Sequence, residues 1–326
     1  ISECLVGSEM CIRDRYNPDD PTSEYYFPQA MAGRRATNWM KELTRNGSLQ
    51  EYELIASGGA GKTTYYTSLS YNKTNGIVPT VGFEKMQIRA NLDTELNKWL
   101  KMGTRLHGGY MKVSDVQNSL LGDSGLAPTN PFYSGMALAP TMNAYNEDGS
   151  YNFDLPFVFN VNPIAAIREQ DKYDKQYKFN GTVYLEWKPI KGLVLRSEAT
   201  IGLTWKDQYR FYGALTSEGQ KNNSQPVANI QKDYTFKYIW TNTASYGFTL
   251  KNVHNISLLL GQEIYHSQNT KNVQKNRYFP RAFEADQAWA NMGFGTPQES
   301  YTQLSTPDRT ASFFGQASYN LSLIHI

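Results

Sequence analysis

The feature that most limits what this chain can fold into is the polarity pattern of residues 177–205. In residues 177–187, every second residue is apolar or small, and the residues between them are mostly polar or charged. A period of two places these two sets on opposite faces of a β-strand. A break at 188–192 contains a proline and a glycine, and the alternation then resumes over 193–205. The pattern therefore predicts a β-hairpin with one apolar face and one charged face.

Two kinds of protein accommodate such a hairpin. A soluble sandwich exposes the charged face to bulk water, and a large membrane barrel exposes it to a watery lumen. Segment 193–205 is about twice as long as a usual globular strand. Trp187 and Trp205 end the two strands, and together with Trp240 on a later strand they are candidates for an aromatic girdle at the membrane surface. Strand length and tryptophan placement favour the barrel.

The same alternation recurs along the chain and predicts about nine strands. A threonine cap, helical apolar spacing and a terminal glycine predict one short helix within 37–47. The fold class is predicted to be all-β, a partial antiparallel transmembrane β-barrel. The expected strands are 49–58, 63–72, 83–96, 99–113, 177–187, 193–205, 234–250, 254–265 and 310–320.

The connections between these strands alternate in length. From residue 73 onward, every long connection falls at one end of the up-and-down sheet. Short periplasmic turns and long extracellular loops are typical of an outer-membrane barrel, although a lectin can also gather its binding loops at one end. The short turn at 58–62 is expected at the long-loop end, as the one exception. The long connections are 73–82, 114–175, 213–233 and 267–308, and 114–175 is the long extracellular insertion.

The two ends of the chain are expected to be non-native. Residues 10–15 (MCIRDR) and 321–326 (LSLIHI) can be encoded by one nucleotide word and its reverse complement. Transposase-based library preparation leaves such an inverted repeat at fragment ends. Residues 1–15 and 321–326 are therefore predicted to be translated adapter and are left out of the fold reasoning. Residues 16–320 are the predicted partial barrel.

Composition removes several classes of function. No apolar run approaches the roughly 18 residues that a spanning helix needs, and a net charge of +2 gives no electrostatic case for nucleic acid. Both cysteines, Cys4 and Cys11, lie in the excluded end, and His107, His254 and His266 are too scattered for a metal site. We expect no metal, no cofactor and no enzymatic activity.

Residues 56–63 (ASGGAGKT) fit a relaxed phosphate-loop pattern. That chemistry needs a helix directly after the lysine and threonine, so that its N-terminus faces the phosphates. The residues that follow form a predicted strand instead. We interpret the segment as a glycine-rich hairpin turn.

Residues 122–125 (GDSG) are similar to the nucleophile segment of trypsin-like proteases. A catalytic triad also needs a histidine base and an orienting carboxylate. His107 is the upstream candidate, and it lies on a predicted strand. We therefore interpret the segment as a turn inside the long insertion.

Aromatic residues in the insertion are the only signal for a ligand. With Asn and Asp between them, they suit stacking on sugar rings or holding peptides. The alternative is a loop mini-core that folds the insertion onto itself, and both readings stay open. The candidate substrate contacts are Tyr133, Tyr145, Tyr151, Phe153, Phe157 and Phe159.

Several segments resemble one family in the right order along the chain. Residues 37–47, 57–59 and 64–71 resemble the opening barrel strands of the SusC/RagA-type TonB-dependent outer-membrane transporters. No one match is diagnostic alone, but together they are specific. The further matching segments are 75–78, 89–92, 99–101, 162–166, 189–193 and 313–315.

The resemblance implies a plugged barrel of about 22 strands in the outer membrane of a Gram-negative bacterium. Such proteins import glycans or peptides, usually under a SusD-like surface lipoprotein, with energy delivered by TonB to the plug. Nothing in this sequence matches the plug, and no functional residue is carried over. The chain is expected to supply the barrel portion of TonB-dependent import. The alternative is a soluble secreted carbohydrate-binding β-sandwich, whose apolar face would pack against a second sheet.

Overall fold

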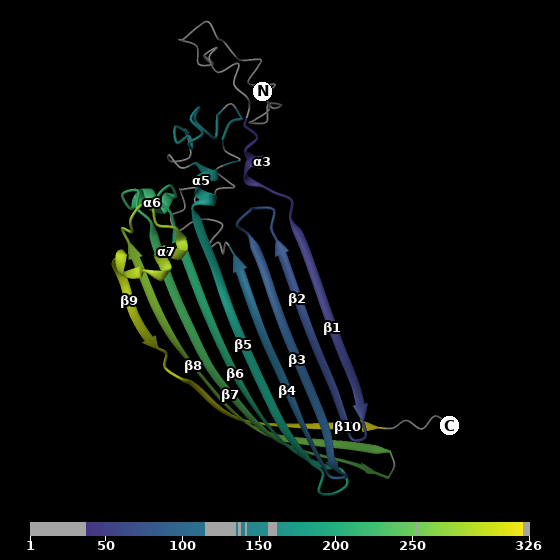
Figure 1. Cartoon of the computed structure of the whole chain (residues 1–326). Helices are drawn as coiled ribbons and strands as arrows, with labels where there is room; N and C mark the ends of the chain where they lie inside the picture. The colour runs from purple at the N-terminus through teal and green to yellow at the C-terminus, as the bar shows by residue number, and fades with distance from the viewer. Residues whose placement is uncertain are drawn as a thin grey trace, which may run out of the picture.

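In the computed structural model, residues 37–114, 135, 138–140, 142–155, 162–251 and 253–321 are described. They form one ten-stranded antiparallel sheet in which β1 to β8 lie in sequence order, and β9 and β10 both pair with β8 (Figure 1). The described helices are all short, and none is long and apolar enough to cross a membrane. The strands are β1 (Ser48–Ala60), β2 (Thr63–Asn75), β3 (Gly82–Asn97), β4 (Leu100–Ser114), β5 (Gln170–Trp187), β6 (Leu193–Tyr212), β7 (Val227–Leu250), β8 (His254–Arg277), β9 (Thr296–Leu304) and β10 (Asp308–Leu321). The helices are α3 (Trp39–Leu43), α5 (Pro163–Arg168), α6 (Ser217–Lys221), α7 (Ala285–Ala290) and the 3-10 helix η1 (Met292–Phe294).

All nine predicted strands and the short helix within 37–47 are present, but the strands extend further than predicted. β5 begins inside the expected loop 114–175, β7 begins inside 213–233, and β8 continues into 267–308. In the added segments the apolar alternation is absent or interrupted, so it gives no clear signal. They are held by the ladder of backbone hydrogen bonds to neighbouring strands.

A tenth strand, β9, also lies inside the expected loop 267–308. β9 pairs with the distal part of β8, and β10 pairs with the proximal part of the same strand. The amide of Ser305 donates to the carbonyl of Asn269 at 2.8 Å in the break between them. Pro307 has no amide hydrogen to donate and also lies in this break. β9 and β10 therefore act as one interrupted strand.

The short and long connections lie at opposite ends of the sheet (Figure 1). The turns at 61–62, 98–99, 188–192 and 251–253 form the short-turn end, and the longer connections form the long-loop end. The expectation that the first turn lies at the long-loop end was wrong, because successive connections of antiparallel neighbours must alternate ends. The sorting by length thus has no exception among the described hairpins.

The glycine-rich segment 56–63 closes the first hairpin. Gly61 has a φ of +60° in the turn, a conformation that glycine adopts without strain. β2 begins at Thr63, where a phosphate loop would need a helix. The hairpin interpretation is therefore confirmed. The GDSG segment at 122–125 and the ends 1–15 and 322–326 lie outside the described residues.

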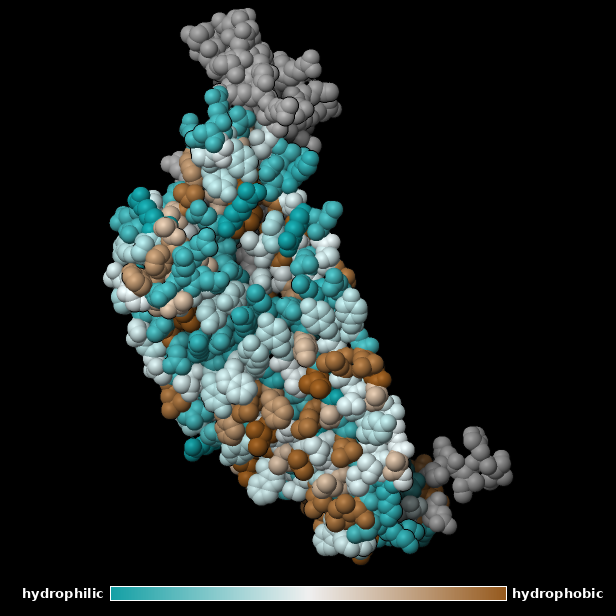
Figure 2. Space-filling model, viewed as in Figure 1, coloured by the Kyte–Doolittle hydropathy of each residue, from teal (hydrophilic) through white to brown (hydrophobic). Residues whose placement is uncertain are grey.

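The two faces of the sheet have opposite polarity and opposite exposure. We call the face that carries Tyr184 and Arg210 the inner face, and the face that carries Leu260 and Phe313 the outer face. Tyr184 and Arg210 are 3% and 8% exposed, whereas Leu260 and Phe313 are 68% and 82% exposed. Figure 2 shows hydrophobic residues gathered on the lower half of the visible surface. A water-soluble fold has the reverse arrangement.

No second sheet covers the outer face in the described part of the chain. The sandwich alternative required such a layer, so the structure contradicts it. Apolar side chains displayed outward from long strands, with charges on the sheltered side, are the arrangement of a transmembrane barrel wall. The fold is a partial antiparallel transmembrane β-barrel, as predicted.

Candidate functional site

The inner face carries a charged cluster near the short-turn end. Register places Asp93 of β3 and Tyr184 of β5 on either side of Gly103 of β4. Because Gly103 has no side chain, the tyrosine hydroxyl reaches across β4 and donates to the Asp93 carboxylate. Arg105 Nη2 also contacts Asp93, at 2.8 Å. The carboxylate is therefore fully engaged by its neighbours.

Arg196 of β6 covers the same tyrosine from the other side. Its guanidinium carbon lies 3.8 Å from the centroid of the Tyr184 ring, a cation–π contact. The guanidinium pairs with Glu198 and lies 3.8 Å from Glu186, which also pairs with Lys188 at 3.2 Å. Cations and carboxylates are matched here, so the cluster suits a rigid section of the barrel wall.

A second matched cluster lies on the inner face nearer the long-loop end. Arg210 of β6 pairs with Asp174 of β5 at 2.6 Å, and Lys206 pairs with the same carboxylate at 3.0 Å. Gln208 adds an amide hydrogen bond to Asp174 at 3.1 Å. Both Asp174 and Arg210 are buried. This network joins β5 to β6 where the strands rise toward the loops.

Between the two clusters, the inner face is basic and polar. Arg89, His107, Asn180, Gly202 and Lys237 form one continuous row across β3 to β7. The adjacent row toward the long-loop end is Gln87, Gly109, Lys178, Thr204 and Thr235. His107 Nε2 and Gln87 Nε2 lie 3.1 Å apart and are hydrogen-bonded. Sequence reasoning missed this band because its members come from five strands.

Half of the predicted loop contacts lie in the described residues. Tyr145 and Tyr151 form an isolated β-bridge, and their ring centroids are 5.6 Å apart. Both pack against the loop core, which contains Trp39 and Leu155. This is the packing expected of a loop mini-core, and substrate contact by these side chains stays a prediction. Phe153 is half-buried, and Tyr133, Phe157 and Phe159 lie outside the described residues.

Asn162 is the residue that holds this loop together. Its side-chain amide donates to the carbonyls of Ala144 and Asn152 at 2.7 and 2.9 Å, and its oxygen accepts from the amide of Ile164 at 2.9 Å. It caps α5, with Pro163 as the first helical residue. An asparagine followed by a proline is typical of a helix start, so this pair could have predicted α5 from the sequence.

The outer face carries an aromatic row. Trp205 faces Tyr234 with ring centroids 5.5 Å apart, and Tyr110 faces Tyr177 at 5.2 Å. Trp187 lies at the short-turn end of β5, and Trp240 lies within β7. A girdle role for the three tryptophans stays a prediction. By register, the row contains Tyr52, Tyr71, Met86, Tyr110, Tyr177, Trp205 and Tyr234.

The sequence is similar to curated receptors from Formosa agariphila (strain DSM 15362 / KCTC 12365 / LMG 23005 / KMM 3901 / M-2Alg 35-1). It is 27% identical over 311 residues to TonB-dependent receptor P26, covering 90% of this chain and 28% of that receptor. It is 24% identical over 308 residues to TonB-dependent receptor P3, covering 92% of this chain and 29% of that receptor. The chain therefore spans less than a third of the length of these relatives. No family model matches the sequence.

The fold is similar to that of solved transporters. The RagAB peptide importer in its closed-closed state gives a TM-score of 0.66 at 18% identity, covering 88% of this chain and 31% of that chain. The RagAB peptide transporter gives 0.64 at 18% identity, covering 88% and 32%. The chain has the fold of a barrel segment of these transporters, and its sequence is similar to TonB-dependent receptors.

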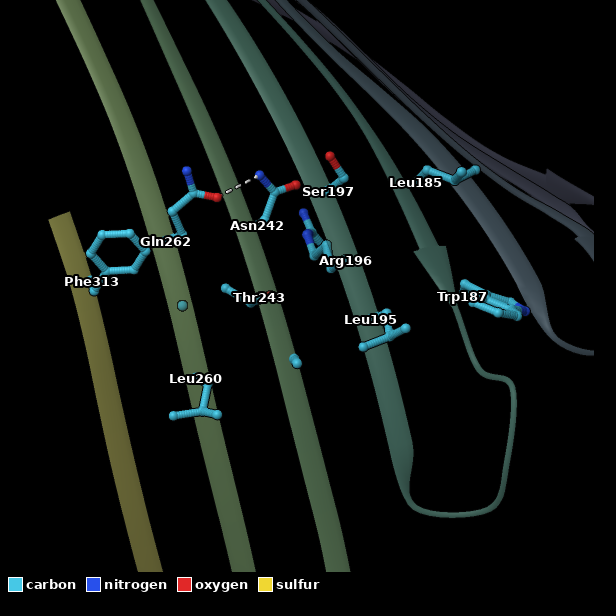
Figure 3. A pocket seen from close by; sticks show the side chains of 12 residues that line it. Leu185, Trp187, Leu195, Arg196, Ser197, Asn242, Thr243, Leu260, Gln262 and Phe313 are labelled. Carbon is cyan, nitrogen blue, oxygen red and sulfur yellow. Dashed lines mark hydrogen bonds between the residues drawn. The ribbon is translucent and has the colours of Figure 1, made fainter. Parts of the chain in front are cut away.

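On this barrel segment, a groove lies on the outer face. A groove of about 520 Å³ runs between Trp187 and Phe313 and includes Leu260 (Figure 3). Asn242 Nδ2 donates to Gln262 Oε1 at 3.5 Å within it. Since these side chains point away from the inner face, the groove is not on the path of a solute through the barrel. The inner face and the loops are the candidate substrate surfaces.

Proposed function

We propose that the receptor imports a nutrient across the outer membrane of a Gram-negative bacterium, with energy delivered by TonB. This chain would supply part of the barrel wall and several extracellular loops, and residues 16–320 would be its native portion. The observation that carries the proposal is the inverted polarity of the sheet: apolar side chains on the exposed face and charged side chains on the sheltered face. Such a wall separates lipid from a polar passage.

The relatives support the class of activity. Both curated relatives are named TonB-dependent receptors, and the solved neighbours are described as a peptide transporter and importer. We propose a glycan or peptide as the substrate and a SusD-like surface lipoprotein as the partner at the long-loop end. TonB would act through a plug that this sequence does not match.

Deletion and complementation of the full-length gene test this proposal. We expect the receptor to fractionate with outer membranes and to show heat-modifiable gel mobility. Nutrient uptake should be lost without the receptor and without TonB, and should return when the missing component is restored. Partition of the full-length protein into the aqueous phase, or uptake that continues without TonB, would contradict the proposal.

A further inference from the structure

The inner face has a band of positive charge between its two matched clusters. Three cations define this cationic band: Arg89 on β3, Lys178 on β5 and Lys237 on β7. They occupy two adjacent rows of the register, with His107 between Arg89 and Asn180. Neighbouring strands lie about 4.8 Å apart, so the backbones that carry the three cations are separated by about 10 Å from one to the next.

The cationic band has no matching carboxylates. From β3 to β7, its two rows contain only neutral residues besides the cations and His107. Among the described residues, no ion pair involves Arg89, Lys178 or Lys237. Arg105 and Lys206, which lie on either side of the band, both pair with aspartates, at 2.8 and 3.0 Å. Arg89 and Lys178 are exposed and Lys237 is half-buried, so the three charges are accessible to a solute. Unpaired positive charges gathered on one surface attract anions.

Glycines shape the floor of the cationic band. A Cβ placed on Gly202 would lie 2.8 Å from Cγ of Lys237 and 3.0 Å from Oδ1 of Asn180. The Lys237 side chain therefore lies across β6 toward the strand that carries Lys178. Gly109 adds a second position without a side chain, where the nearest side-chain atom to a Cβ would be Cγ of Gln87 at 4.0 Å.

From these contacts we infer that the cationic band binds the anionic groups of an acidic oligosaccharide, one bearing carboxylate or sulfate. A guanidinium binds either group through two parallel hydrogen bonds, and lysines add point charges. This assignment rests on the proposed import function and names its substrate class.

The neutral neighbours favour an oligosaccharide over an acidic peptide. Gln87, Asn180, Thr204 and Thr235 offer amide and hydroxyl groups that can hydrogen-bond sugar hydroxyls. Apart from the polar imidazole of His107, the two rows from β3 to β7 contain no aliphatic or aromatic side chain that would form a pocket for an apolar peptide side chain. The cationic band is polar throughout.

The test uses the full-length receptor in detergent and calorimetric binding. The ligands are a uronic-acid oligosaccharide, a sulfated oligosaccharide, a neutral oligosaccharide of equal length and an acidic peptide. We expect an acidic oligosaccharide to bind, and the triple variant R89Q/K178Q/K237Q to lose at least about tenfold in its affinity, since a charge-assisted hydrogen bond contributes about 1.5–3 kcal/mol. A comparison of the uronic-acid and sulfated oligosaccharides shows whether the receptor recognises carboxylate or sulfate.

Two further variants control for charge and for folding. Lys98→Gln removes one positive charge at the 98–99 turn, away from the cationic band, and should leave affinity unchanged. Gly202→Ala removes no charge but displaces the Lys237 side chain. It should weaken the binding of acidic ligands, while retained heat-modifiable gel mobility shows that the barrel still folds. Unchanged affinity in the Gly202→Ala receptor would contradict a role for the Lys237 side chain placed across β6.

The inference is overturned if the triple variant binds acidic oligosaccharides as well as the parent does, if neutral sugars bind equally, if only the acidic peptide binds, or if no acidic oligosaccharide binds. TonB-dependent uptake of any nutrient by the same receptor would show that the proposed function survives such a result. Loss of TonB dependence would instead remove the proposed function itself.

Discussion

Single glycines decide how side chains on the inner face meet. Gly103 lies between Asp93 and Tyr184 in the register, and a Cβ there would collide with the tyrosine ring and the carboxylate. Arg105 and Arg196 then hold the ring from two sides. The cluster depends on the absence of a side chain at Gly103, because Tyr184 and Asp93 fill the space that such a side chain would occupy.

We expect Gly103→Ala to destabilise the barrel by about 1–3 kcal/mol, as overpacking of a filled site does. The added methyl group must displace the buried Tyr184 ring, which breaks its hydrogen bond to Asp93. In the full-length receptor, the temperature at which the compact gel band is lost should fall.

Gly109→Ala is the matched control for this change. It lies on the same strand and the same face, but its nearest neighbours would be 3.8 and 4.0 Å from a Cβ, an ordinary contact distance. Its melting temperature should stay close to that of the parent. Equal effects of the two substitutions would show that backbone freedom, and not the Tyr184 contact, explains the loss.

At the scale of one strand, alternation decides which substitutions the membrane tolerates. Leu260 lies on the outer face of β8 and is 68% exposed, and Leu259 lies on the inner face. Leu260→Arg should cost about 2–4 kcal/mol if its position is near the bilayer midplane. Leu259→Arg faces the polar side and should cost much less.

Folding of the two variants into lipid vesicles, followed by denaturant titration, measures this difference. The pair is matched in residue type, substitution and place on the strand. If Leu259→Arg proved the more harmful of the two, the assignment of inner and outer faces would be reversed.

The loop insertion depends on one helix cap. Asn162 is fully buried and joins Ala144, Asn152 and Ile164 through three hydrogen bonds. Asn162→Ala should leave the carbonyls of Ala144 and Asn152 without this hydrogen-bond donor, which should cost about 1–3 kcal/mol in loop stability. We expect faster proteolysis within 138–168, with the barrel itself unchanged.

Asn146→Ala is the control for the loop. Its side chain also makes two hydrogen bonds, to Ser150 and Tyr151, but both are exposed and water can replace them. Limited proteolysis with mass spectrometry compares the two variants. Similar cleavage in both would mean that the buried cap does not hold the loop.

The sheet as a whole is open. β1 at one edge is exposed along its full length, and β10 at the other edge is exposed at all but one position. Unpaired edges and an exposed apolar face favour aggregation in water. Near the long-loop end a small core covers part of the outer face, where Phe211 and Ala228 pack against Phe279 and Ala288.

We expect this segment, expressed alone, to fail to fold in water. Its outer face would be exposed to solvent, and each of its two edge strands would lack a partner on one side. Size-exclusion chromatography and thermal melting of the isolated segment check this, with the full-length receptor in detergent as the control. A soluble monomer that melts cooperatively would contradict it.

The period-two pattern of residues 177–187 and 193–205 predicted strands, faces and the barrel class, because alternation is a local property of the backbone. The pattern does not predict a strand where the apolar alternation is absent or interrupted. The start of β7 and all of β9 are held by hydrogen bonding to neighbours, and they carry no clear alternating apolar signal. The end predicted for the 58–62 turn was wrong, because successive connections alternate ends, so this turn and the turn between β3 and β4 lie at the same end.

The sequence by itself determined that this chain makes long two-faced strands with an apolar side suited to lipid. Only the tertiary structure decided which residues meet across them. Arg89, Lys178 and Lys237 come together because the register aligns five strands, and a shift by one residue would send each side chain to the opposite face. Register is a relation between strands, so no single stretch of sequence contains it.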